Sequence, residues 1–336
     1  MNENGLGVFL GVGLMSFLPV ILFAVVLCVI VVSVVRSSEK HKAKMNQIEL
    51  EHGDVVQKYI NILTSNPVLN EEREKSKKAG KLFLVFLICG FILFFLLPPI
   101  GIVLIIGGAI YSSVKGGNYK KMFKENVMVH ALREYDSNLV YSPNGVFPQE
   151  VYRSARFEGY DRYSSEDQIN GVIDGYEFLM AEVHTENRHT DKDGHTHYTT
   201  VFRGQVAWIN ITTSLGFDLS VVDNCIKLFS GDTHVEIDNQ EFEEHYDVFS
   251  TDKIKAMKVL TPNVTNKILD LNRKYGFKFE IKLLGNQLFF RFRADNLFEP
   301  NASDVKAEAV GIALYFEILN GIKEIMHEMM EAMKRA

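Results

Sequence analysis

Two uncharged stretches constrain this chain more than any other feature of its sequence. Gly5 to Val35 covers 31 residues and Leu82 to Val114 covers 33, and neither contains a charged side chain. About 20 apolar residues are enough to cross a bilayer as a helix. The sequence therefore predicts an integral membrane protein in which residues 115–336 are ordinary polar sequence.

The first stretch is too long to be a single simple span. As one helix, its 31 residues would rise about 47 Å, against a hydrocarbon core of about 30 Å. We expect only about residues 14–35 to cross the bilayer, within a transmembrane segment over residues 1–36. Its leader contains no Lys or Arg, whereas a signal peptide begins with a basic region. Gly7 and Gly11 have the spacing with which small residues pair membrane helices.

The second stretch contains Pro98 and Pro99 at its centre. Consecutive prolines remove helical hydrogen bonds and break a helix. We therefore predict a transmembrane hairpin over residues 82–114, with Leu82 to Leu97 as one arm and Ile100 to Val114 as the other. Each arm is short, at about 24 Å by helical rise.

Basic residues flank these stretches and predict the topology. The three clusters are Arg36, Lys40, Lys42 and Lys44; then Lys75, Lys77, Lys78 and Lys81; then Lys115, Lys120, Lys121 and Lys124. Basic loops stay on the cytoplasmic side, and all three clusters do so only if the second stretch crosses twice. The prediction is a multi-pass protein of the cell membrane with three spans, an external N-terminus and a cytoplasmic C-terminal domain.

The polar segments divide by their periodicity. Apolar residues at helical spacing predict a cytoplasmic helical stalk over 37–81 and a second stalk helix over 115–135. Residues 136–303 read as a β-rich soluble domain, and residues 304–336 as an amphipathic C-terminal helix. Methionines on that helix (Met326, Met329, Met330 and Met333) either pack internally or bind a partner. The predicted fold is a membrane helical part followed by a soluble α+β domain, mainly antiparallel.

Local signals in the soluble domain favour hairpins. Residues 175–185 and 198–212 alternate like strands around a polar loop over 186–197, and short strands are expected near 217–222 and 233–238. Residues 263–275 predict a helix that ends at Gly276, and Thr261 followed by Pro262 predicts the cap at its start. Gly285 and Asn286 form a two-residue turn between the strands 277–284 and 287–293.

Composition excludes some classes of function. Residues 115–336 carry 26 Lys and Arg against 34 Asp and Glu, so an acidic domain is a poor partner for nucleic acid. The three cysteines include one in the polar domain, Cys225, which allows no disulfide framework there and fits a reducing compartment. No ionisable residue lies in a predicted span, which argues against ion or proton transport.

The polar loop is the candidate ligand site. His189, Asp193, His195 and His197 lie close in sequence, with His184 and Asp191 nearby. Two histidines separated by one strand residue point to the same face, a geometry that Zn²⁺ accepts. A solvated loop tip rich in polar residues explains the same cluster. We therefore expect no resident cofactor, with zinc as the alternative.

The segment from Ser250 to Asp252, with His245, contains nucleophile, base and acid types. A catalytic triad is defined in space rather than by sequence adjacency. The pattern is better explained by a strand that enters an Asx-stabilised turn, so no catalytic residue is assigned here.

The run from Phe242 to Pro262 resembles the most recognisable segment of the DUF3137 family, roughly F-x-x-x-[FY]-x-V-[FY]-S-x-D followed by Ala and L-T-P. Other matches, in the family's order, are Val201–Gly204, Leu288–Arg291 and Phe298–Pro300. The resemblance covers about residues 80–305. It implies a membrane-attached, bacterial, β-rich domain, and it supplies no activity because the family has no assigned reaction.

The sequence does not determine the function. The leading hypothesis is a membrane-anchored, non-catalytic interaction or scaffold module that contacts the lipid bilayer and either binds a protein partner or self-associates. The alternative is a metal-dependent membrane-bound hydrolase that uses the His-rich loop.

Overall fold

The computed structural model describes residues 53–211, 216–224, 233–294 and 299–335. The chain divides into two compact units, Met1–Val56 and Gln57–Ala336. Apart from residues 53–56, the fold described below belongs to the second unit. The predicted first span lies outside the described residues.

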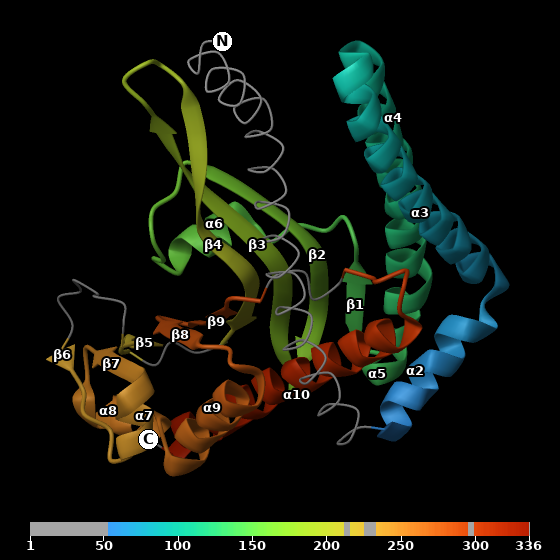
Figure 1. Cartoon of the computed structure of the whole chain (residues 1–336). Coiled ribbons are helices and arrows are strands. Elements are labelled where there is room, and N and C mark those ends of the chain that lie inside the picture. Colours follow the sequence, from blue (N-terminus) through green and yellow to red (C-terminus); the bar gives the residue numbers. More distant parts are fainter. Residues whose placement is uncertain (1–52, 212–215, 225–232, 295–298, 336) are drawn as a thin grey trace, which may run out of the picture. The chain divides into compact units, whose positions relative to one another are not determined.

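One antiparallel sheet forms the centre of the second unit (Figure 1). Within the described residues its nine strands follow the order β1-β2-β3-β4-β9-β8-β5-β7-β6. The strands are β1 (Leu139–Ser142), β2 (Arg162–Ile173), β3 (Tyr176–Thr190), β4 (Thr196–Asn210), β5 (Leu219–Asp223), β6 (Thr233–His234), β7 (Tyr246–Ser250), β8 (Phe279–Leu284) and β9 (Gln287–Phe292). This confirms the prediction of a mainly antiparallel domain.

The long hairpin of β3 and β4 extends further than its sequence pattern indicated. Pairing continues to Thr190 and Thr196, so most of the expected loop over 186–197 is strand. Only residues 191–195 form the turn, in which the Asp191 amide donates to the carbonyl of His195 at 3.0 Å. The predicted β8–β9 hairpin is present, and Gly285 has the positive φ of 61° that such a turn requires.

Two different layers cover the two faces of the sheet. Alternate residues of β3 and β4 point to one face, where they pack with Phe147 and with Tyr152 of the short helix α6 (Gln149–Ser154). The other face meets the long helix α10 (Val305–Arg335), whose Tyr315 hydroxyl donates to the sulfur of Met180 on β3. The four methionines near the end of α10 are buried, so they pack in the core rather than forming an exposed docking surface.

Three further helices complete the domain: α7 (Gln240–His245), α8 (Lys253–Val259) and α9 (Pro262–Tyr275). The boundaries of α9 follow the sequence signals. The Thr261 side chain accepts from the amide of Val264, and Gly276 ends the helix in the left-handed region with φ 67°. Lys274 pairs with Glu317 of α10, so α9 is fixed against the C-terminal helix.

A helical hairpin extends from the sheet domain (Figure 1). It consists of α3 (Pro67–Leu96) and α4 (Pro98–Phe123), with Leu97 between them. The prediction placed Pro98 and Pro99 in the turn, but both belong to α4, and Pro98 is its first residue. A first-turn proline is tolerated because its missing N–H would have no helical partner.

Glycines bring the two helices of the hairpin close together. A Cβ added to Gly101 would lie 2.5 Å from the carbonyl oxygen of Gly90, and one added to Gly108 would lie 2.7 Å from the Phe86 ring. Small residues allow this close backbone approach between membrane helices. Most other apolar side chains of the hairpin are exposed, among them Leu84, Ile88, Phe95, Val103 and Ile110.

The hairpin continues into the domain at both of its ends. Before it lies α2 (Gly53–Ser65), and the side chain of Asn66 caps the start of α3. After it, α4 passes through a π-helical turn, η1 (Lys124–Met128), into α5 (Val129–Tyr135) and then β1. Both α3 and the run from Pro98 to Tyr135 are long and apolar enough to cross a membrane.

Candidate functional site

The structure brings two of the predicted metal ligands together at the tip of the β3–β4 hairpin. His189 and His197 are register partners, and their ring centroids lie 5.5 Å apart. Both side chains are exposed. A ring nitrogen of His189 already bonds the Thr199 hydroxyl at 2.7 Å. Two imidazoles on neighbouring strands supply two ligands of the four that zinc usually takes.

The other predicted residues lie in the turn or away from it. Asp193 and His195 belong to the turn, where the Asp191 carboxylate accepts from both of their backbone amides, at 3.0 and 2.8 Å. His184 lies further along β3 and bonds the hydroxyl of Thr200 at 3.0 Å. The metal site thus stays a prediction: two histidines face each other, and the Asp191 carboxylate stabilises an Asx turn.

A second group of carboxylates lies between β2 and the residues before α10. Among the described residues, Glu166, Asp167 and Glu299 are the only three potential ligands whose atoms lie within 4.8 Å of one another. Lys124 pairs with Asp167 at 2.5 Å, and Lys120 pairs with Glu299. These two lysines also lie near Glu166, at 3.4 and 3.8 Å, so the three carboxylates belong to one ion-pair cluster.

The backbone of Asp167 itself has an unusual conformation. Its φ is 59°, a left-handed value that L-residues other than glycine seldom adopt. The strand register shifts between Glu166 and Ile169, and this irregularity turns the carboxylate toward Lys124 and the Tyr141 hydroxyl. Burial raises the pKa of Asp167, while the bonds from Lys124 and Tyr141 oppose that rise.

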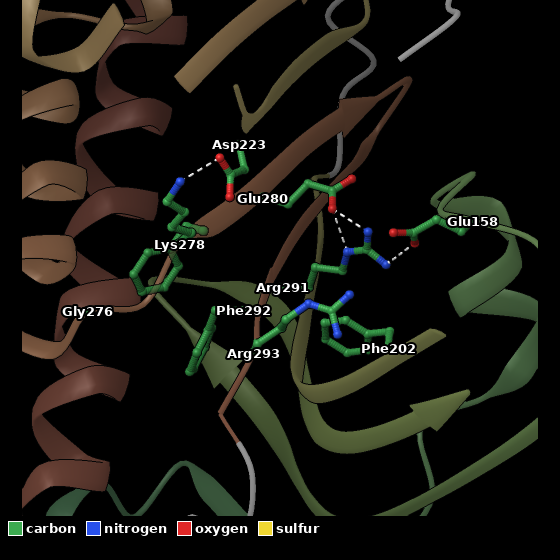
Figure 2. Close-up of a pocket in the computed structure, with 10 residues that line it drawn as sticks. Glu158, Phe202, Asp223, Gly276, Lys278, Glu280, Arg291, Phe292 and Arg293 are labelled. Carbon is green, nitrogen blue, oxygen red and sulfur yellow. Dashed lines mark hydrogen bonds and ion pairs between the residues drawn. The ribbon is translucent and has the colours of Figure 1, made fainter. Parts of the chain in front are cut away.

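A cavity of about 230 Å³ lies beside β8 and β9 (Figure 2). Arg291 of β9 is its central charge and is buried. Its guanidinium donates to Glu280 at 2.6 Å and pairs with Glu158 at 2.5 Å. It also lies over the Phe157 ring, 4.0 Å from the centroid, a favourable position for a cation.

The charges around this cavity are matched to one another. Burial alone would lower the pKa of Arg291, but Glu280 and Glu158 raise it above its ordinary value. Burial also raises the pKa of Glu158, yet Arg291 more than offsets this and the pKa is lowered. Lys278 pairs with Asp223 at 2.7 Å. The contacts of Arg291 join the 156–158 loop to the sheet. Both Arg291 and Lys278 already have a carboxylate partner.

A buried polar joint connects the helical hairpin to α10. Arg73 of α3 pairs with Glu308 at 2.9 Å and donates to the hydroxyl of Tyr119 on α4 at 3.0 Å. Tyr119 in turn donates to Glu308 at 2.6 Å. The side chains of Arg73 and Glu308 are 3% and 0% exposed, so water does not screen the pair. Burial raises the pKa of Glu308, and Tyr119 and Arg73 oppose this rise.

The segment around Ser250 has a structural role. The Ser250 hydroxyl donates to the carbonyl of Asp218 at 2.7 Å, and it accepts from the amide of Asp252 at 3.1 Å. The Asp252 carboxylate caps α8 by accepting from the amide of Lys255. These contacts agree with the turn that the sequence indicated.

Sequence reasoning missed the buried charges. Arg291 lies between two phenylalanines in a strand that is otherwise apolar after Gln287, and a charge in that position is a usable signal. Arg73 and Lys124 gave no such signal, because both occur in charged helical runs. Their partners, Glu308 and Asp167, are distant in the sequence.

The family model described as "Protein of unknown function (DUF3137)" matches residues 200–331. This match supports a relationship of the segment to the DUF3137 family. The match runs from β4 into α10 and confirms the resemblance noted in the sequence, while its description assigns no activity. No curated protein matches the chain.

One solved structure shows a distant likeness. It is described as the crystal structure of the mycobacterial trehalose monomycolate transport factor A, TtfA. The alignment has 8% identity and a TM-score of 0.33, and covers 60% of this chain and 96% of that one. At this level the likeness carries no argument about function.

Proposed function

We propose that this DUF3137 protein is a membrane-anchored, non-catalytic module whose sheet domain binds a protein partner or self-associates. The observation that carries the membrane anchoring is the exposed apolar surface of the α3–α4 hairpin. Only 11% of the most apolar window of either helix is buried. A core helix of a soluble protein would be covered on most sides, so lipid is the natural solvent for this surface.

The packing within the hairpin supports a bilayer location. Gly90, Gly101 and Gly108 allow backbone contact where bulky side chains would separate the helices, as membrane helix pairs require.

The proposed topology has three spans. The stretch from Gly5 to Val35 crosses the cell membrane once and the hairpin crosses it twice. The N-terminus then lies outside the cell and the sheet domain lies in the cytoplasm. The three basic clusters support this orientation. A compartment-sensitive reporter fused at Ala336 tests it, and a signal from the external side would refute the cytoplasmic assignment.

Cross-linking in native membranes tests the interaction role. We expect a discrete cross-linked species if the sheet domain acts by binding a partner or a second copy of itself. Resistance to extraction at alkaline pH tests anchoring separately. A clean monomer with no cross-linked partner would refute the interaction role and leave the anchoring intact.

A metal-dependent hydrolase is the second candidate, favoured only by the facing rings of His189 and His197. It predicts stoichiometric zinc in the purified protein and the loss of that zinc in His197→Ala. Zinc content determined by elemental analysis separates it from the leading proposal.

A further inference from the structure

A cavity of about 870 Å³ lies at the polar end of the α3–α4 hairpin. One wall is α3, the other is α4, and the residues that precede α10 close it on a third side. We call it the hairpin-base cavity. It lies next to both ends of the uncharged stretch from Leu82 to Val114, which Lys81 directly precedes and Lys115 directly follows.

Cations dominate the charge of the hairpin-base cavity. Lys77, Lys81 and Lys120 line it, against a single carboxylate, Glu299. Lys120 is paired with Glu299, and Lys77 with Glu74 at 3.2 Å. Lys81 is exposed, and it makes no ion pair or hydrogen bond within the described part of the chain. The cavity thus offers a net positive site with one uncommitted ammonium group.

Glycines keep this cavity open. Gly80, Gly116 and Gly117 line it, and a Cβ added at any of them would meet no atom within 4 Å. Gly90, Gly101 and Gly108 in the same hairpin are packed against backbone or ring atoms instead. Glycine weakens a helix, and close helix packing does not explain Gly80, Gly116 and Gly117. Their effect is to leave space between α3 and α4, both of which carry lysines here.

We propose that the hairpin-base cavity binds the phosphate of an anionic phospholipid headgroup, with Lys81 as its principal contact. This rests on the proposed membrane anchoring and specifies the partner of the anchor. The exposed apolar side chain of Leu84 forms the end of the cavity toward the apolar helices. A phosphate attached to acyl chains meets both the cations and this apolar end, whereas a soluble phosphate meets only the cations.

The test is native mass spectrometry of the full chain from detergent micelles that contain equal amounts of phosphatidylglycerol and phosphatidylcholine. We expect the wild type to retain phosphatidylglycerol preferentially. Lys81→Gln should lower this preference about fivefold, which corresponds to about 1 kcal/mol. The matched control is Lys78→Gln, an exposed lysine of the same helix outside the cavity. Equal losses in the two variants would indicate diffuse charge attraction and would overturn the proposal.

A second pair of variants tests the cavity by volume. Gly117→Leu introduces a side chain into the cavity at a position where a Cβ meets no atom within 4 Å, and Gly107→Leu places the same side chain on an exposed face of α4 within the apolar stretch. Only Gly117→Leu should lose the bound lipid. If glycerol phosphate displaces the lipid at an equal concentration, the site recognises soluble phosphate and the lipid assignment is wrong. Extraction of the same variants from membranes reports anchoring, so a failure of that role is seen separately.

Discussion

Removing Arg73 should destabilise the joint between the hairpin and α10 by about 3–5 kcal/mol, the usual result of breaking a buried ion pair. The guanidinium is 3% exposed, and it bonds Glu308, Tyr119, Asn70 and the carbonyl of Leu63. In Arg73→Met, the Glu308 carboxylate keeps only the hydroxyl of Tyr119 as a hydrogen-bond donor among the described contacts. A buried charge without its counter-ion is the main source of the expected loss.

The single tryptophan makes this loss measurable. Trp208 lies on β4, so its fluorescence during denaturant unfolding in detergent micelles reports on the sheet. The matched control is Arg273→Met on α9, whose guanidinium pairs with Glu241 at 2.7 Å but is 49% exposed. Water and salt screen an exposed pair, so the control should change the free energy of unfolding little.

Two further results follow if the charge of Glu308 causes the loss. The double variant Arg73→Met, Glu308→Gln should recover about 2 kcal/mol, a typical coupling between contacting residues. Burial already raises the pKa of Glu308, and loss of Arg73 raises it further. The cost should therefore be largest above that raised pKa and shrink as the pH falls through it toward the ordinary value of about 4.3. Equal losses in Arg73→Met and Arg273→Met, with no pH dependence, would refute the reasoning.

Three other outcomes are expected. Gly101→Leu should separate the hairpin helices and lower the thermal midpoint in micelles, because its Cβ would meet the Gly90 carbonyl at 2.5 Å; an unchanged midpoint would contradict the packing. The lowered pKa of Glu158 means that its stabilisation is present above the ordinary value of about 4.3 and is lost as the pH falls through the lowered one, so Glu158→Gln should flatten the acid limb of a stability–pH curve. Chelators should leave the unfolding midpoint unchanged, because His189 and His197 lie on the exposed tip; a clear shift would indicate a structural metal.

Local signals explain how much of the fold the sequence could predict. The cap at Thr261, the stop at Gly276 and the turn at Gly285 each need only neighbouring residues, and all three are present. The apolar alternation of the β8–β9 hairpin is equally local. The strand β2 was missed because polar residues and the irregularity at Asp167 interrupt its alternation.

The hairpin arms were predicted from the uncharged stretch and its two prolines, and the flanking segments were predicted as stalk helices. In the structure these parts are continuous, since α3 begins 15 residues before Leu82 and α4 ends nine residues after Val114. Those extensions are polar helix whose packing depends on contacts distant in sequence. The Arg73–Glu308 pair joins residues 235 apart, and no pattern within one helix identifies such a partner.

The basic cluster after the hairpin shows how one set of lysines can serve two purposes. In the sequence, Lys120, Lys121 and Lys124 favour a cytoplasmic position for this end of α4. In the folded chain, Lys124 is buried against Asp167 and Lys120 pairs with Glu299, while Lys121 stays 72% exposed. In our topology, the orientation of the hairpin in the membrane is set when its helices insert, before β2 folds and brings Asp167 to Lys124. The same charges can therefore first orient the hairpin and afterwards fix it to the sheet, and neutralising Lys124 alone should weaken the domain more than it alters the topology.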